Sequence, residues 1–496
     1  MLTVPGAAAE AAGLMPEHRE MVHDLLNVWQ MHYDRNQKCD TYYKMHNKLV
    51  DLGISIPPQL TNLNAACGWA AKAVNVMADH SRFDGFVADD EDFQRMLDGI
   101  VERNNMASRW RKACISALKH CFVAYVVTRG EDGHARVSAY PATLCSGIFN
   151  DVTDELDAGM FVVSMRKERG IVTADPEWVD VVTPEWLIRL KERRRGWWVA
   201  EYIPNGLGHI NMFVAAYNAD YDRPFGTGRI TREVRGYIDS AVRANLNAEV
   251  ASAFAASAQK YLLGTDSDPF GKISKWDAYI GSIFNIDAGE NGTPQFGQLP
   301  QPSMQPLADH WRMLCGKMSA ATGIHVSQFG QVHDNPASSD AIYAENEPLV
   351  LACTTWNTDA GIALRRVALA AIATEMGATY DEVVELDLGV IAHFMNPAMP
   401  TLAQMADSSI KLSSAVEGFS DTDTFWEMNG FDAAARKRIK RELRVARARQ
   451  VLFTTPGGRE GEVSDGEGDA AEPGGIPATG GQAGREGEDL LQRSDS

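Results

Sequence analysis

Several stretches of this 496-residue chain hold residue types that could do chemistry, but none has the spacing that the chemistry requires. In the glycine-containing run from Gly264 to Lys272, Gly264 lies two residues too far from Gly271-Lys272 for a phosphate loop. Ile273 also stands where such a loop needs Ser or Thr. Asp266 begins a calcium-loop pattern, but Phe270 takes a ligand position and no glutamate closes the loop. Both patterns predict a turn.

Isolated acidic and imidazole groups do not assemble a recognisable site either. The run Asp89-Asp90-Glu91-Asp92 could suggest a metal, but adjacent carboxylates cannot all converge on one ion, so a solvated helix N-terminus is the better interpretation. His120 precedes Cys121 at a predicted helix-to-strand junction, where we expect a buried, hydrogen-bonded residue rather than a general base. The H-E-x-x-H, G-x-S-x-G and strand-linked G-x-G-x-x-G motifs are absent from the sequence. We therefore expect no enzyme, no cofactor and no metal.

The net charge, the apolar runs and the cysteine count limit the possible classes of protein further. The net charge of -19 argues against tight nucleic-acid binding, which needs clustered Lys and Arg. Solubility explains this acidity; the alternative is that DNA must slide past the protein without adhering. No long apolar run or basic N-terminal region indicates a membrane span or a secretory signal, so the protein is expected to work where it is made. Seven cysteines without a C-x-x-C pair indicate reduced thiols.

One stretch near the C-terminus is strongly basic. Its spacing spreads positive charge around much of a helix, which is consistent with a solvated helix, with a partner for acidic residues of a neighbouring subunit, or with DNA contact. The residues of this basic cluster are Arg436, Lys437, Arg438, Lys440, Arg441 and Arg444, followed by Arg447 and Arg449.

Apolar periodicity predicts helices around a mostly antiparallel sheet. Strand patterns follow one another without helical crossovers, and Glu131-Asp132-Gly133 indicates a hairpin. Pro348 lies inside the longest helical pattern and should kink it. The expected helices are 16–33, 64–80, 93–119, 230–257, 306–322, 338–376, 402–416, 421–428 and 432–453, and the expected strands are 122–127, 135–140, 160–166, 178–183, 186–190, 197–203, 282–287 and 294–299.

A sharp corner precedes the longest helix. Asn335-Pro336 is a turn dipeptide, and Ser338 and Ser339 are natural N-cap residues, so a loop must end and a helix begin within about one turn.

Many short segments, in order, resemble the portal proteins of tailed bacteriophages of the siphophage and actinophage type. Each segment alone is weak, but their shared order across residues 40 to 450 is specific. Lys44-Met45-His46, Cys121 and His325 differ from the residues that are usual at these positions in that family. These differences put the local turn geometry at the three positions in doubt. The segments are Tyr42-Tyr43, Leu52-Gly53-Ile54, Pro57, Trp69, Ala73-Val74, Asp79, Phe83-Asp84-Gly85-Phe86, Asn104-Asn105-Met106, Leu207-Gly208-His209-Ile210, Arg223-Pro224-Phe225-Gly226, Arg229-Ile230-Thr231-Arg232, Gln259 to Gly264, Thr322-Gly323-Ile324, Asp334-Asn335-Pro336, Ala406-Asp407 and Asn429-Gly430-Phe431.

The resemblance implies an α+β portal fold with a fixed order of parts. A wing of helices and antiparallel sheet would occupy residues 1–229, and stem helices at 230–257 and 303–324 would flank a small β clip at 258–302. A tunnel loop at 325–337, a long kinked helix returning to the wing at 338–400 and a helical crown at 401–453 would follow. The acidic, glycine-rich tail at 454–496 has too few aliphatic residues to fold.

By the same resemblance, the chain would form a ring, usually of twelve subunits, at one vertex of the phage head. Double-stranded DNA would pass through it without specific binding during packaging and ejection. The large terminase subunit and then a head-tail adaptor would dock on the clip, and major capsid and scaffolding proteins would be further partners. The protein would thus be found in the virion, and in host cytoplasm during assembly. Another virion structural protein, such as a ring adaptor or a capsid-associated minor protein, is the alternative.

The residues expected at the channel come from the predicted tunnel loop and stem. Asn335, Pro336, Ser338 and Ser339 would shape the corner, and Arg312 and Lys317 would attract DNA locally if they face the lumen. The residues expected to face passing DNA are Gln328, Phe329, Gly330, Gln331, Val332, His333 and Asp334.

Overall fold

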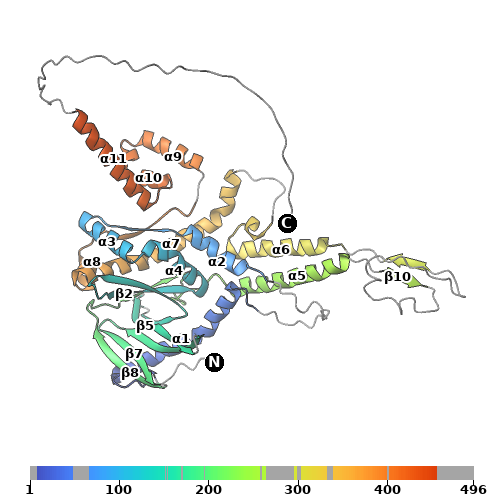
Figure 1. Cartoon of the computed structure of the whole chain (residues 1–496), viewed down its shortest axis with the longest axis horizontal. Coiled ribbons are helices and arrows are strands. Elements are labelled where there is room, and N and C mark those ends of the chain that lie inside the picture. Colours follow the sequence, from blue (N-terminus) through green and yellow to red (C-terminus); the bar gives the residue numbers. More distant parts are fainter. Residues whose placement is uncertain are drawn as a thin grey trace, which may run out of the picture. The chain divides into compact units, whose positions relative to one another are not determined.

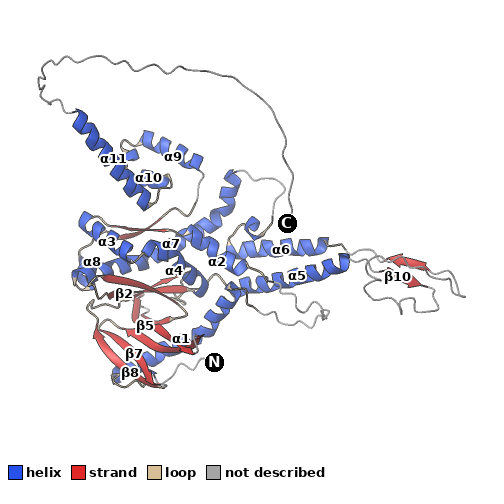
Figure 2. Cartoon of the chain, viewed as in Figure 1, coloured by secondary structure: helices blue, strands red, loops and turns tan. Residues whose placement is uncertain are grey.

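The computed structural model describes most of the chain in two units, divided by their contacts into Met1–Lys437 and Arg438–Ser496. Figure 1 shows the elements in sequence colours and Figure 2 by type. The structure describes residues 8–47, 66–150, 152–153, 155–168, 171–194, 196–256, 260–263, 295–298, 303–331, 339–398 and 402–454. The predicted strand at 282–287, the turns between Gly264 and Lys272, and the acidic tail beyond Thr454 lie outside these residues.

The predicted antiparallel sheet is present as two separate sheets. A three-stranded sheet has the order β3-β2-β9 and a five-stranded sheet the order β4-β5-β6-β7-β8, with every pair antiparallel. Strands β4 and β9 were not predicted. The bounds are β2 Phe122–Arg129, β3 Ala135–Pro141, β4 Cys145–Asn150, β5 Glu155–Glu168, β6 Ile171–Val182, β7 Trp186–Arg194, β8 Trp197–Pro204 and β9 Met212–Ala216.

Helix α1, Pro16–Tyr43, covers one face of the five-stranded sheet. Proline at the first helical turn starts it without losing a hydrogen bond. Its apolar residues recur at helical spacing, so Val22, Leu25 and Trp29 all reach the same side and are no more than 2% exposed. They pack with alternate strand residues such as Ile188, and this small core fixes α1 against the sheet.

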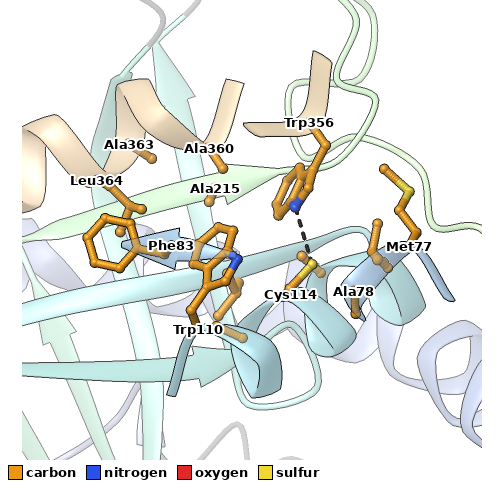
Figure 3. Close-up of a cluster of buried hydrophobic side chains, with 14 of the residues drawn as sticks. Met77, Ala78, Phe83, Trp110, Cys114, Ala215, Trp356, Ala360, Ala363 and Leu364 are labelled. Carbon is orange, nitrogen blue, oxygen red and sulfur yellow. Dashed lines mark hydrogen bonds between the residues drawn. The ribbon is translucent and has the colours of Figure 1, made fainter. Parts of the chain in front are cut away.

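The larger core lies where three helices meet the strands β2 and β3. Helices α2, Trp69–His80, α4, Met106–His120, and α7, Ser339–Met376, contribute nearly half of its buried residues. Figure 3 shows Trp110 of α4 beside Trp356 of α7, with ring centroids 6.0 Å apart in a stacked arrangement. The Trp356 indole Nε1 donates to the Cys114 sulfur at 3.2 Å, which satisfies the polar edge of a ring that is 1% exposed.

The helical signal predicted from Phe93 to Lys119 is divided between two helices. Helix α3, Glu91–Arg103, ends before Asn105, whose φ of 51° cannot continue a right-handed helix, and α4 starts at the next residue. The acidic run does begin α3, because Asp90 accepts hydrogen bonds from the backbone N–H groups of Asp92 and Phe93.

A short antiparallel pair escaped prediction. Strand β1, Phe83–Val87, pairs with β12, Ile391–Phe394, which follows α8, Tyr380–Glu385. The pair brings Asp84 close to residues that lie more than three hundred positions later in the chain.

Helices α5, Arg232–Ala256, and α6, Gln305–Thr322, lie side by side (Figure 1). Between them in sequence, β10, Lys260–Leu263, pairs antiparallel with β11, Gln295–Gln298. After α6 comes one 3-10 turn, η3, Val326–Phe329, and the chain resumes with α7. This is the predicted order of helix, β insertion, helix, loop and long helix.

The C-terminal helices follow the predicted periodicity closely. They are α9, Leu402–Ala415, α10, Asp423–Met428, and α11, Ala433–Thr454, with the short 3-10 helix η4, Phe419–Asp421, before α10.

Helices α1 and α4 are joined by a buried polar contact. One oxygen of Asp40 lies 2.6 Å from Lys119 Nζ and 2.7 Å from His120 Nε2. Burial raises the pKa of Asp40, but the hydrogen bonds from His120 and Lys119 outweigh it and hold that pKa well below its usual range. Burial also lowers the pKa of His120, so the ring is neutral and Nε2–H donates to the carboxylate. The expectation of a buried, hydrogen-bonded His120 is confirmed, although its Nδ1 has no hydrogen-bond partner among the described residues.

Candidate functional site

Helix α6 carries the two predicted stem cations on its exposed face. Leu314, Cys315 and Met318 are no more than 3% exposed and turn the opposite face toward the core. Arg312 and Lys317 are exposed, and Arg312 pairs with Asp309 of the preceding turn at 3.0 Å. Lys317 makes no ion pair with any residue that the structure describes. The α6 surface therefore offers one neutralised and one available positive charge.

The predicted tunnel loop begins with an ordered turn that is tied to its neighbours. His325 Nδ1 lies 2.8 Å from Ser327 Oγ, and His325 Nε2 lies 3.2 Å from a carboxylate oxygen of Glu345 on α7. Gln328 and Gly330 are exposed, and Gly330 adopts a φ of 92°, which favours glycine. Gln331 is half-buried, and its side-chain nitrogen has no partner among the described residues.

The prediction that Phe329 faces DNA is wrong. Its side chain is 4% exposed and packs edge-on against Trp69 of α2, with ring centroids 5.6 Å apart. The Cys315 sulfur also lies 3.7 Å from the Phe329 carbonyl oxygen. Burying an aromatic ring away from water is favourable in free energy. Phe329 therefore anchors the loop to the core instead of lining a solvated surface.

Much of the predicted corner falls outside the described residues. These residues are Val332, His333, Asp334, Asn335, Pro336 and Ser338. Helix α7 begins at Ser339, as the corner predicted to within one residue, and it continues past Pro348. A Cβ at Gly323 would lie 3.7 Å from that of Pro348, so the end of α6 approaches α7 there. The kink at Pro348 stays a prediction.

One residue of the basic cluster of α11 is covered by acidic side chains. Arg436 is 13% exposed and pairs with Asp84, and also with Glu427 at 3.2 Å. Lys437 Nζ lies 2.6 Å from Asp98. Arg436 is therefore an internal ion-pair partner, not part of an open patch. In the second unit, Arg438 pairs with Glu442 four residues later, and Arg441 and Arg444 are exposed. Lys440 is half-buried.

The sequence pattern did not reveal the importance of Arg229, whose guanidinium lies where α2, the end of α6 and the segment after β9 meet. Arg229 is 8% exposed, and its Nε donates to the Ala73 carbonyl oxygen of α2 at 2.8 Å. Its Nη1 donates to the Tyr217 hydroxyl at 3.0 Å, and its Nη2 donates to the carbonyl oxygen of Thr322, the last residue of α6. A cation at a helix C-terminus is favourable, so Arg229 sets where the loop leaves α6.

In the part of the chain that the structure describes, we find no group of side chains arranged as a common catalytic or metal site. No three His, Cys, Asp or Glu side chains gather there as a group that could hold a metal. All seven cysteines are free and buried. Among the described residues, no helix combines the length and apolar character that a membrane crossing requires.

Comparison with known proteins identifies the family. The family model described as phage portal protein, SPP1 Gp6-like, matches residues 22–445. The portal protein of Mycobacterium phage D29 is 22% identical over 428 residues, covering 82% of this chain and 85% of that protein. The portal protein of Mycobacterium phage L5 is 21% identical over 416 residues, covering 81% and 83%.

A solved structure, described as the neck of a native GTA particle computed with C12 symmetry, matches with a TM-score of 0.38 and 10% identity. The match covers 75% of this chain and 92% of that one. The family match spans both sheets, α5, α6 and α7, and most of the C-terminal helices. The chain belongs to the phage portal protein family.

Proposed function

We propose that this chain forms a homo-oligomeric ring at one vertex of a phage capsid, and that DNA enters and leaves the head through the ring. The observation that carries the proposal is the family match from residue 22 to residue 445. The helices α5 and α6, with the antiparallel pair β10 and β11 between them in sequence, would supply a two-helix stem and part of a small clip within that match. The role is structural and mechanical.

The acidic charge of the chain suits a passage through which DNA slides. Each copy carries a net charge of -19. The charge of a ring of about twelve copies would thus sum to roughly -230 before screening. At 0.1 M salt, the electrostatic potential of this charge decays over about 10 Å. Such a wall repels phosphates, so DNA meets no deep energy well along its path. Any attraction must then be local.

The exposed face of α6 and the turn that follows it are the proposed DNA-facing surface. Lys317 supplies positive charge beside the Arg312–Asp309 ion pair, and Gln328, Gly330 and Gln331 continue the surface with uncharged groups. The residues from Val332 to Asp334 complete the proposed loop. Phe329 is not included, because its ring is buried.

Reversing both α6 charges, Arg312→Glu with Lys317→Glu, is expected to lower the DNA retained per head at least about twofold, because the local attraction becomes repulsion in every copy. The measurement is nuclease-protected DNA per assembled particle. The matched control is Arg109→Glu with Lys112→Glu on the exposed face of α4, which changes the net charge equally. If both double variants retain the same DNA as the parent, α6 does not line the channel.

Partners dock on different parts of the ring in this proposal. The clip, residues 258–302, would receive the large terminase subunit during packaging and a head-tail adaptor afterwards. Capsid and scaffolding proteins would contact the ring during assembly in host cytoplasm, before the ring becomes part of the virion.

Electron microscopy of the purified full-length chain tests the proposed function directly. A symmetric ring with a central hole is expected, and a compact monomer under assembly conditions would count against it. ATPase and nuclease assays on the same sample should show neither activity, because the ring is a passage and not the motor.

A further inference from the structure

A cavity lies beside α1, at the point where α4 turns into β2. Its volume is about 360 Å³, and Trp29, Phe122 and Phe225 give it aromatic walls. Asp222 and Arg223 line it too and are exposed, so the cavity opens to solvent on that side. Such a pocket, mostly apolar with a few polar groups, is the usual form of a small-molecule site.

Two residues that line this cavity have polar atoms with unusual hydrogen bonding. The first is His120 Nδ1, on a side chain that is 3% exposed, which has no hydrogen-bond partner among the described residues. Because its Nε2–H already donates to Asp40, the neutral ring presents a lone pair at Nδ1. The second is the Cys121 sulfur, whose contact is a hydrogen bond from Arg35 Nη2 at 2.7 Å. By contrast, Asn36 and Ser146 in the same walls donate to the carbonyl oxygens of Ala142 and Leu25.

The backbone holds Cys121 in an unfavourable conformation. Its φ is 92°, which glycine adopts freely and a side-chain-bearing residue does not. The conformation is imposed from both sides, because Cys121 N–H donates to the Ala117 carbonyl at 2.8 Å and its carbonyl accepts from Tyr217 N–H at 2.7 Å. A single residue therefore joins α4 to β2, and a thiol occupies this position at an energetic cost.

A second thiol lines the same cavity and provides a contrast. Cys145 donates its S–H to the Pro141 carbonyl at 3.1 Å, and burial raises the pKa of that thiol. Nothing positive faces its sulfur among these contacts. Cys121, in comparison, has a guanidinium against its sulfur, and a positive charge stabilises the negative charge that sulfur carries when it attacks.

We propose that Cys121 is a thiol-modification site that undergoes exchange with small disulfides carrying a carboxylate. The Arg35 guanidinium and the exposed Arg223 attract the carboxylate, while the aromatic walls receive the apolar part. In the exchange, the Cys121 thiol loses its proton to solvent and the sulfur attacks one sulfur of the disulfide. The disulfide bond breaks, its electron pair leaves on the departing thiolate, and a mixed disulfide remains on Cys121.

Competitive labelling of the folded, full-length chain tests the proposal. The chain is reacted briefly with an aromatic disulfide bearing two carboxylates, quenched and digested, and each cysteine peptide is quantified by mass spectrometry. Cys121 is expected to react at least about tenfold faster than Cys145. Equal rates at the two thiols, or faster reaction at Cys145, would overturn the proposal.

Two variants separate the role of charge from that of access. Arg35→Met is expected to slow the reaction of Cys121 about tenfold with the dicarboxylate, and less with the neutral aromatic disulfide dithiodipyridine. Arg35→Lys should keep most of the rate. An Arg35→Met chain that labels Cys121 as fast as the parent would refute the role of the guanidinium.

Cys121→Gly supplies a folded chain without the thiol. Glycine relieves the strained backbone, so this variant should melt at a higher temperature than the parent and lose the fast labelling phase. Persistence of that fast phase in Cys121→Gly would assign it to another cysteine and sink the proposal.

Discussion

Replacing Arg229 with methionine is expected to destabilise the folded chain by about 3 kcal/mol, because two buried carbonyl oxygens and a half-buried hydroxyl each lose a donor. The methionine side chain fills similar space but offers no N–H group to Ala73, Thr322 or Tyr217. The loss at Thr322 matters most, since this carbonyl is at the C-terminus of α6 and has no following helical turn to satisfy it.

The free energy of unfolding from urea titration measures this loss. Arg229→Lys keeps a positive charge but cannot reach three acceptors in a fixed fork, so it should fall between the parent and Arg229→Met. The matched control is Arg232→Met, at an exposed position at the start of α5, and it should change stability by less than about 0.5 kcal/mol. If Arg229→Met is as stable as this control, the junction does not depend on the guanidinium.

Elements with a long, regular pattern could be predicted from sequence because their stability comes from one continuous face. Helix α1 is an example, since Val22, Leu25 and Trp29 recur at helical spacing and all reach the sheet. Strand β1 could not be predicted, because Phe83–Val87 is short and contains Asp84 and Gly85. Its partner β12 lies about three hundred residues away, and local sequence does not encode that pairing.

In the candidate site, too, local features could be predicted from sequence, but contacts between distant residues could not. The start of α7 was predicted to within one residue from local turn chemistry, because Asn-Pro and N-cap serines act within a few residues. Phe329 was misplaced, since its location is decided by Trp69, far away in the sequence. Arg436 was misplaced for the same reason: a run of basic residues indicates an exposed helix, but it does not show that Asp84 will cover one of them. The junction at Arg229 likewise depends on α2 and α6 meeting, which no short motif records.

Four charged side chains connect β1 and β12 to α10 and the start of α11. His393 lies 3.0 Å from Glu427 and 3.6 Å from Asp84, and Arg436 pairs with the same two carboxylates. The side chains of Asp84 and Arg436 are 8% and 13% exposed, so water screens their pair weakly. Two acids and two bases thus balance in charge, provided that His393 is protonated.

The hydrogen bonds to Asp84 and Glu427 raise the pKa of His393 from 6.5 to about 9, against the lowering effect of burial. A raised pKa in the folded state means that folding favours the protonated ring. Its contribution to stability is therefore complete below pH 6.5 and is lost as the pH rises through about 9. The full shift would correspond to about 3 kcal/mol. Because His393 is partly exposed, screening by solvent reduces this to about 1–2 kcal/mol.

His393→Gln is expected to abolish this pH dependence, because glutamine keeps hydrogen-bonding groups but does not titrate. Between pH 6.5 and pH 9 the parent should lose about 1–2 kcal/mol of unfolding free energy more than the variant does, as measured by urea titration at each pH. At pH 9 the two chains should be nearly equal in stability, since the parent has then lost most of the advantage. His310→Gln, at an exposed position of α6, is the control and should follow the parent at every pH. A His393→Gln chain whose stability falls with pH as steeply as the parent's would show that the four-residue cluster does not hold α10 to β12 through the protonated ring.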